Sequence, residues 1–203
     1  MSVFDEYAQE YDSWYDKNRF SFLSEIEAIK KVLPPGRGVE IGTGSGRFAK
    51  ELGIKWGVEP SKAMAQMCLR RGVKVEIAQA ESLPFASGSF DFALFVTSFC
   101  FLKEPLAALR EAHRILSPGG CVILGIIDRE SFLGKAYGKK KSKFYEEAHF
   151  YSAAEAIEIL KRAGFRFEKA YQTLFINPSQ LRKIDEIREG FGEGSFVVMR
   201  ACK

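Results

Sequence analysis

The stretch VEIGTGSGR, residues 39–47, decides how this 203-residue chain folds. A short apolar strand, GVEIG, leads into three alternating glycines and then into a helix that begins near Arg47. Glycine at Gly42, Gly44 and Gly46 lets the backbone come close to a ligand, because a Cβ atom there would collide with it. In open α/β sheets, ligands bind beyond the carboxyl ends of the strands. The stretch therefore predicts a strand–loop–helix unit that holds a ligand.

Strand and helix patterns alternate on both sides of this unit. Further strands are expected at 55–58, 73–77, 90–96 and 121–127, followed by a closing pair at 165–175 and 196–200. The 73–77 run alternates apolar and polar residues, as at a sheet edge, whereas the 90–96 and 121–127 runs are apolar throughout, as in buried strands. Helices are expected at 22–33, from Ser61, at 104–116, from Ser152 to Gly164, and around 181–187.

Capping patterns mark where some of these helices begin. Ser24 with Glu27, and Ser152 with Glu155, have the spacing of a capping box. Together the elements predict one α/β domain over 1–203, Rossmann-like and doubly wound, with a mostly parallel seven-stranded sheet that ends in an antiparallel strand.

Composition excludes several classes of protein. The net charge of +4, from 30 basic and 26 acidic residues, is too small and too dispersed to indicate nucleic-acid binding. No apolar run approaches the ~20 residues of a membrane span, and no signal-peptide core follows Met1. The cysteines show neither a paired motif nor a histidine at metal-ligand spacing; they are Cys68, Cys100, Cys121 and Cys202. We therefore expect reduced thiols, no metal and a cytoplasmic protein.

An acidic residue follows the second strand. Glu59 lies 19 residues after Glu40, close to the ~20-residue spacing at which nucleotide-binding folds place a ribose-binding carboxylate (59 − 40). Alternatively, its charge favours the positive end of the helix that starts at Ser61. A dinucleotide fingerprint would need glycine where Arg47 stands.

Several motifs occur in one order along the chain: EIGTGSGRFA, GVEPSKAM, QAESLPFASGSFD and LAALREAHRILSPGG, between an N-terminal YDSWYD and a GFRF…FVVMR tail. With these motifs the chain resembles a class I S-adenosylmethionine (SAM)-dependent methyltransferase of the small-molecule, ubiquinone/menaquinone-biosynthesis-like group (methyltransferase type 11). The resemblance implies SAM as cofactor and a small-molecule acceptor. It also implies an N-terminal helical lid at 1–20, for which a helix packed on the domain is the alternative, and a substrate-side insertion at 128–150.

The resemblance further implies a set of cofactor-binding residues. The glycines would hold the methionine moiety, Glu59 the ribose hydroxyls, and the turn after the third strand the adenine. The full set is Glu40, Gly42, Gly44, Gly46, Glu59, Pro60, Ser61, Met64, Gln79, Ala80, Glu81, Thr97, Ser98 and Tyr11. Two departures stand out: Gln79 replaces the usual Asp, and Cys100 with Phe101 occupies positions where relatives often carry histidine.

Without those histidines, no general base is evident. Methyl transfer tolerates this, because SAM carries an activated methyl group and much of the catalysis is alignment. His149 is the reserve candidate. Rings dominate the regions expected to cover the acceptor: Tyr11, Trp14, Phe99, Phe101, Phe132, Tyr137, Phe144, Tyr145 and Phe150. They predict an apolar or aromatic acceptor that needs little deprotonation, such as an amine, a thiolate or an acidic phenol.

Two other functions remain open from the sequence: a SAM-binding module without catalysis and, less favoured, a dinucleotide oxidoreductase. The run Lys139–Lys143 is either a solvated loop or an attractor for an acidic acceptor. Asp128 is explained equally by turn chemistry and by a role at the site, and His113 is expected to be structural. The acceptor, the atom methylated and the oligomeric state are not predicted.

Overall fold

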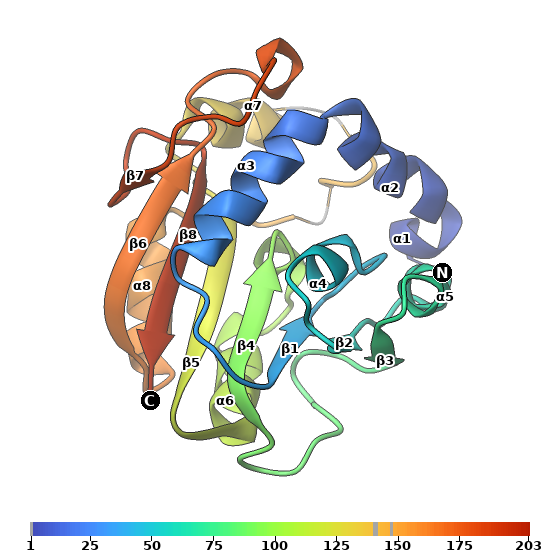
Figure 1. Cartoon of the computed structure of the whole chain (residues 1–203), viewed down its shortest axis with the longest axis vertical. Coiled ribbons are helices and arrows are strands. Elements are labelled where there is room, and N and C mark those ends of the chain that lie inside the picture. The colour runs from blue at the N-terminus through green and yellow to red at the C-terminus, as the bar shows by residue number, and fades with distance from the viewer. Residues whose placement is uncertain (1, 140–141, 147) are drawn as a thin grey trace.

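The computed structural model describes residues 2–139, 142–146 and 148–203 (Figure 1). The strands are β1 (Gly38–Ile41), β2 (Trp56–Val58), β3 (Lys74–Glu76), β4 (Phe90–Val96), β5 (Leu116–Ile127), β6 (Arg166–Thr173), β7 (Arg188–Glu189) and β8 (Phe196–Cys202). The helices are α1 (Val3–Glu6), α2 (Ala8–Lys17), α3 (Arg19–Lys30), α4 (Arg47–Glu51), α5 (Lys62–Arg70), α6 (Pro105–Ile115), α7 (Phe132–Lys139) and α8 (Ala153–Arg162).

The strands form one eight-stranded sheet in the order β3-β2-β1-β4-β5-β8-β6-β7. Pairing is parallel from β3 to β5, and antiparallel where β8 joins β5 and β6 and where β7 joins β6. The Rossmann-like, mostly parallel sheet is therefore confirmed, with β3 at its edge as predicted. The eighth strand is the two-residue β7, which is too short to leave a sequence pattern.

Helices cover both faces of the sheet, and each face has its own apolar core. Figure 1 shows α3 and α4 in front of the sheet and α6 and α8 behind it. Strand β4 contributes to both cores, because successive side chains point to opposite faces. Burial on both faces is the physical reason why the sequence of this strand is apolar almost throughout.

Of the three helix starts expected from a capping residue, two are confirmed and one is wrong. Ser61 caps α5, and Ser152 forms a capping box with Glu155 at the start of α8. The box predicted for Ser24 and Glu27 does not exist, because α3 already begins at Arg19. Ser24 lies inside that helix, where its hydroxyl donates to the Phe20 carbonyl (2.6 Å) and accepts from the Asp185 N–H (2.8 Å).

The helix expected around 181–187 is also wrong. Only a 3₁₀ turn at Pro178–Gln180 forms there, and the following residues are irregular. The Asp185 N–H bonds to Ser24, and its carboxylate accepts from the Phe175 N–H at 2.8 Å. These tertiary bonds replace the bonds that a helix would have made within itself.

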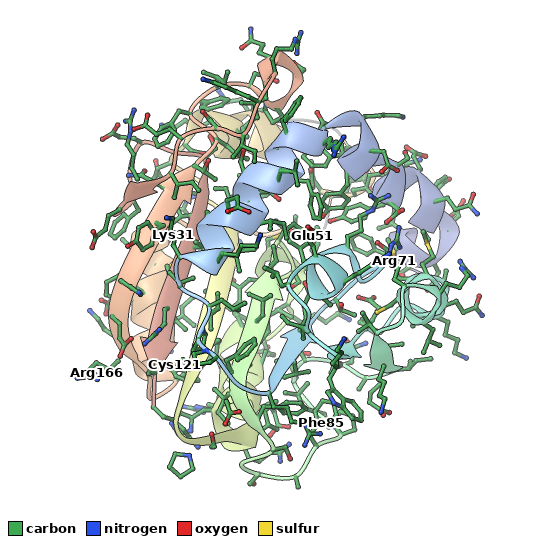
Figure 2. The ribbon with its side chains drawn as sticks, viewed as in Figure 1. Lys31, Glu51, Arg71, Phe85, Cys121 and Arg166 are labelled. Atoms are coloured by element: carbon green, nitrogen blue, oxygen red, sulfur yellow. A yellow bond between two sulfur atoms is a disulfide. The ribbon has the colours of Figure 1, made fainter. Side chains whose placement is uncertain are left out.

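The expectation of four free thiols is wrong for one pair. Cys121 and Cys202 form a disulfide, whereas Cys68 and Cys100 are free. The two paired cysteines are 81 positions apart, but β5 and β8 place them directly opposite each other. Figure 2 shows Cys121 low on the sheet, on the side away from the N-terminal helices.

The N-terminal helices α1 and α2 arch across the end of the sheet to which β1 and β4 point (Figure 1). No helix in the described part of the chain is long and apolar enough to cross a membrane.

Candidate active site

The glycine loop follows β1 at the carboxyl edge of the sheet. A Cβ atom added at Gly42 would lie 2.5 Å from the Cβ of Ser98, and one at Gly46 would lie 2.7 Å from the Sγ of Cys68. These two positions therefore need glycine for packing. Gly44 also has a positive φ of +54°, but a Cβ there would meet no described atom within 4 Å. The loop thus leaves open space above Gly44, as a ligand cradle requires.

Glu40 holds this loop in place from the end of β1. Its Oε2 accepts hydrogen bonds from the Thr43 hydroxyl (2.7 Å) and from the Ala49 N–H (2.9 Å). The side chain is buried, and this burial raises the pKa of Glu40 to about 8. Glu40 therefore ties the strand, the loop and helix α4 together.

Glu59 follows β2 and is also buried. Its Oε2 accepts from the Gly44 N–H (2.8 Å) and its Oε1 from the Ser61 N–H (2.9 Å). Its carboxylate thus lies beside the glycine loop and at the start of α5, so both interpretations of this residue agree with its position. Each carboxylate oxygen has a second lone pair, which remains available to a hydroxyl donor. Burial raises the pKa of Glu59 above its ordinary value.

The residues after β4 extend the site toward the middle of the sheet. The Ser98 hydroxyl donates to the Ile41 carbonyl at 2.9 Å, which places Ser98 against the glycine loop. Thr97 has a φ of +51°, a conformation that side chains with a branched Cβ rarely adopt. Such strain is concentrated at functional sites, because only the surrounding structure can maintain it.

The remaining expected cofactor residues lie around the same edge. Met64 is buried in α5, Ala80 is buried after β3, and Pro60 and Gln79 are exposed. Glu81 accepts a long hydrogen bond, 3.3 Å, from the N–H of Glu104. Because β1, β2, β3 and β4 are parallel neighbours, the loops that follow them share one edge of the sheet.

Asp12 of α2 attaches the N-terminal helices to this edge. Its carboxylate accepts from the Ser45 hydroxyl, from Nε and Nη2 of Arg47 (both 2.7 Å) and from Nη2 of Arg71 (2.7 Å). Burial alone would raise the pKa of Asp12, but these donors lower it to about 2. At α1, Oδ1 of Asp5 accepts from the Ser61 hydroxyl at 2.7 Å. Sequence reasoning missed this cluster, since no local pattern connects Asp12 with partners 33 to 59 positions away.

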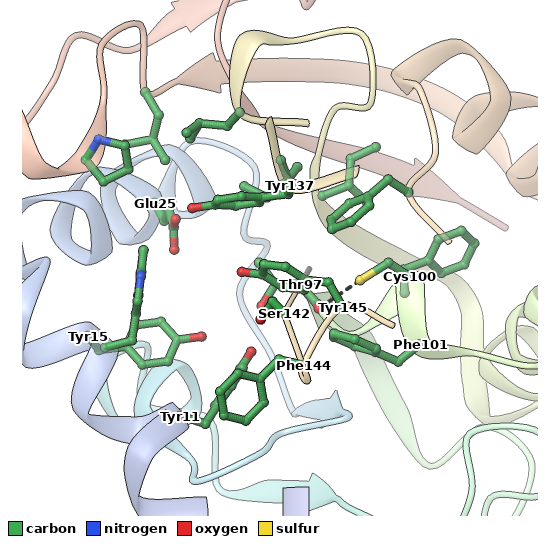
Figure 3. Close-up of a pocket in the computed structure, with 18 of the residues that line it drawn as sticks. Tyr11, Tyr15, Glu25, Thr97, Cys100, Phe101, Tyr137, Ser142, Phe144 and Tyr145 are labelled. Carbon is green, nitrogen blue, oxygen red and sulfur yellow. Dashed lines mark hydrogen bonds between the residues drawn. The ribbon is translucent and has the colours of Figure 1, made fainter. Parts of the chain in front are cut away.

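A cavity of about 300 Å³ adjoins Thr97 between the carboxyl ends of β4 and β5, helix α2 and the segment after β5 (Figure 3). Eight of the nine rings that the sequence predicted for the acceptor region line it; Phe132 is exposed instead. Tyr15 and Tyr151 complete the aromatic lining. Leu174, which like Thr97 has a positive φ, also contributes to the wall.

Glu25 of α3 is a lining residue that sequence reasoning missed. It is only 2% exposed, and its Oε2 has no hydrogen-bond partner among the described residues. Figure 3 shows its carboxylate directed into the cavity, on the same side as Tyr15 and Tyr137. Burial raises the pKa of Glu25 to about 8, against an opposing effect of the nearby Ser21 hydroxyl. The sequence gives one signal for Glu25: it is an acid surrounded by apolar residues at helical spacing.

His149, the reserve base expected from the sequence, lies outside the cavity lining. Its side chain is exposed, and its ring packs against the ring of Tyr151 with 4.5 Å between the centroids. Its backbone N–H donates to the Cys100 carbonyl at 2.7 Å. That backbone bond fastens the segment before α8 to the turn after β4.

Other residues weighed from the sequence lie elsewhere. Asp128 accepts from the Glu130 N–H at 2.9 Å, which is turn chemistry. In the run Lys139–Lys143, Lys140 and Lys141 lie outside the described residues, and Lys143 pairs with Glu10 of α2 at 2.6 Å.

His113 packs its ring against Phe165, with 5.1 Å between the ring centroids, in keeping with the structural role expected for it. Within the described ranges, no group of three or more metal-ligating side chains that could hold a metal ion is present.

Comparison with known proteins shows the family to which this fold belongs. The family model described as "Methyltransferase domain" matches residues 39–124. A crystal structure from Thermotoga maritima, of a SAM-dependent methyltransferase and possible histamine N-methyltransferase, is 52% identical with a TM-score of 0.97. The alignment covers 99% of this chain and 98% of that one. The chain belongs to the class I SAM-dependent methyltransferases and is an enzyme that uses SAM.

Two further proteins are similar to this chain. An uncharacterised protein of Methanocaldococcus jannaschii is 52% identical over the full length of both chains. A SAM-dependent methyltransferase from Archaeoglobus fulgidus has a TM-score of 0.71 at 18% identity, covering 95% of this chain and 99% of that one. At that identity the likeness shows the fold alone.

Proposed function

We propose that the aromatic cavity is the acceptor site and that the enzyme methylates a small molecule with an apolar or aromatic body. The observation that carries the proposal is the position of the cavity: it adjoins Thr97, and the neighbouring Ser98 contacts the glycine loop. Ligand pockets are mostly apolar with a few placed polar groups, and this lining has that character. A volume of about 300 Å³ suits a small acceptor.

For the cofactor, we propose the residues at the carboxyl ends of β1 to β4. The open space at Gly44 would take the methionine moiety, and the free lone pairs of Glu59 would accept from the ribose hydroxyls. SAM supplies a methyl group that is already activated on a sulfonium. The chain has then to orient the acceptor and exclude water, which strengthens the electrostatic interactions inside the site.

We propose residues 1–20 as a lid and 128–150 as the acceptor-side segment of a single domain. Tyr11 and Trp14 from the first, and Tyr137 and Phe150 from the second, line the cavity from two sides. Lys143 joins the two segments through its ion pair with Glu10. The Thermotoga maritima relative is described as a possible histamine N-methyltransferase. An acceptor of that size is in keeping with this cavity.

We also propose a cytoplasmic location. Disulfides such as Cys121–Cys202 are rare in cytoplasmic proteins, except in those of hyperthermophiles. The redox state of this pair in the cell therefore tests the proposed location. Alkylation of free thiols in freshly lysed cells, followed by mass spectrometry, measures how much of this pair is oxidised inside the cell.

The experiment that tests the cofactor site is a calorimetric titration with S-adenosylhomocysteine. Glu59→Ala should weaken binding by about 1.5–3 kcal/mol, the usual range for hydrogen bonds to a charged group. Glu76→Ala is the matched control, because Glu76 is an exposed acid at the end of the neighbouring strand β3. Unchanged affinity in Glu59→Ala, together with a lowered Tm, would show that Glu59 only supports the start of α5. NAD should neither bind nor raise the Tm.

A further inference from the structure

Glu25 is a buried acid with an unpartnered carboxylate oxygen. Its side chain is directed into the cavity, and Oε2 has no hydrogen-bond partner in the described part of the chain. Among the described residues, the hydroxyl of Ser21, on the same helix, is the one nearby group that lowers its pKa. A buried carboxylate oxygen without a partner is costly for the folded state. A ligand that donates a hydrogen bond to Oε2 would account for the buried position of Glu25.

The groups that face Glu25 from other elements do not neutralise it. Its negative charge contributes to raising the pKa of four tyrosines, although burial is the larger cause in each case: Tyr11 and Tyr15 on α2, Tyr137 on α7, and Tyr145. These four groups are neutral phenols at ordinary pH.

The other ionisable groups of the lining leave Glu25 uncompensated as well. Among the described residues of the lining the one cation is Lys17, which is exposed at the surface. Glu10 also contributes to the lining, but its carboxylate is bonded to Lys143. The thiol of Cys100 is neutral, because burial raises its pKa to about 12.

The walls around Glu25 are aromatic, and the faces of aromatic rings attract cations. Tyr137 stacks on Tyr145 with 4.9 Å between the ring centroids, and Tyr11 lies edge-on to Phe144 at 5.4 Å. When Glu25 is ionised, its carboxylate and the rings together suit an alkylammonium group. The carboxylate accepts from the N–H donors, and the π-faces attract the positive charge. A phosphate or a carboxylate acceptor would be repelled by the same groups.

We propose that the methyl acceptor is an amine that enters the cavity as an ammonium ion, and that Glu25 binds this ammonium and accepts its proton. This inference rests on the proposed function of the cavity. Glu25 then fills the role of the base that Cys100 and Phe101 cannot supply.

A carboxylate oxygen of Glu25 takes one proton from the ammonium group and leaves a neutral amine with a lone pair. The acceptor nitrogen uses this lone pair to bond to the methyl carbon, while the electron pair of the carbon–sulfur bond returns to sulfur. The product is a methylated ammonium ion and S-adenosylhomocysteine, with the acceptor's proton on Glu25.

The test compares 2-phenylethylamine with 2-phenylethanol, which has nearly the same shape but no positive charge. Binding to the cofactor-free protein is measured by calorimetry at pH 8, and S-adenosylhomocysteine release is measured with SAM present. The variants are Glu25→Gln, which keeps the shape of the side chain, and Glu27→Gln as control. Glu27 lies on the same helix but faces solvent, where it pairs with Lys30.

We expect the wild-type protein and Glu27→Gln to bind the amine at least tenfold more tightly than the alcohol. Glu25→Gln should lose this preference, and its turnover should fall by about 100-fold or more, the usual contribution of a positioned base. Its affinity for S-adenosylhomocysteine should stay within twofold of wild type. Unchanged amine binding in Glu25→Gln, or a wild-type preference for the alcohol, would overturn the inference while leaving the cavity as acceptor site. Failure of the wild-type protein to bind either probe would overturn both.

Discussion

Asp12 offers the sharpest test of how the N-terminal helices are held on the enzyme. Replacing it with Ala removes four hydrogen bonds, all from Ser45, Arg47 and Arg71. Hydrogen bonds to charged groups contribute about 1.5–3 kcal/mol each, but bonds in one network do not add. Arg47 also keeps Asp16, and Arg71 keeps the Ser45 carbonyl. We therefore expect a loss of about 2–4 kcal/mol in the free energy of unfolding.

The assay is urea unfolding of the Asp12→Ala protein beside Asp16→Ala. Asp16 is bonded to the same guanidinium but its side chain is 68% exposed, so its loss should cost below about 1 kcal/mol. Because Ser45 belongs to the glycine loop, Asp12→Ala should also weaken binding of S-adenosylhomocysteine. Equal destabilisation by the two variants would refute the idea that the buried network holds the N-terminal helices in place.

The pH dependence of the same network follows from the direction of the shift. The pKa of Asp12 lies at about 2, below the ~3.9 of an unfolded chain. Its contribution is therefore present above pH ~4 and is lost as the pH falls through about 2. The stability difference between wild type and Asp12→Asn should accordingly narrow below pH ~4.

Three other predictions can be checked with purified protein. Gly44→Ala should lose affinity for S-adenosylhomocysteine. Gly53 also has a positive φ and open surroundings, so Gly53→Ala should lose only stability. Calorimetry measures the affinity and a melting curve measures the stability. The pKa of Glu25, about 8, lies above its unfolded value of ~4.3, so wild-type stability should fall as the pH rises between these two values. In Glu25→Gln part of that fall should disappear in melting curves. Replacing Cys121 and Cys202 with serine should lower the free energy of unfolding by about 4 kcal/mol, given the 81-residue separation; a reductant should have the same effect on wild type.

The sheet could be predicted from the sequence because its strands carry strong local signals. The apolar runs of β4 and β5 and the alternation of β3 each follow from how many faces of the strand are buried. Helices with a cap were also predictable, as Ser61 and Ser152 show. The failures lie where tertiary contacts prevail over local ones: Ser24 bonds to the N–H of Asp185, 161 positions away, inside a helix that had already begun.

The glycine loop and Glu59 could be expected at one site because neighbouring parallel strands end at the same edge. The contact itself, from the Gly44 N–H to Glu59, spans only 15 positions. The contacts of Asp12 and the disulfide join residues that are 33 to 81 positions apart, for which a single sequence contains no rule. The rings of the cavity lie between these cases. The sequence shows that these rings are abundant. Only the fold shows that eight of the nine line one cavity.

The missing histidines after β4 bear on where this enzyme obtains a base. The sequence suggested that no base was needed, because Cys100 and Phe101 offer none and His149 was the reserve. In the structure Cys100 lines the cavity as a neutral thiol, and His149 lies outside the lining. The opposite wall, however, presents Glu25 from α3.

If Glu25 is the base, the turnover rate should follow an enzyme group whose pKa depends on how well the N-terminal helices keep solvent out of the cavity. A variant that loosens the N-terminal helices, such as Asp12→Ala, should then shift the pH profile of turnover toward lower pH, because solvent that enters the cavity stabilises the carboxylate. The measurement is the rate of S-adenosylhomocysteine release across the pH range in wild type and Asp12→Ala. A pH profile that follows only the acceptor's own pKa, in both proteins, would favour the base-free alternative.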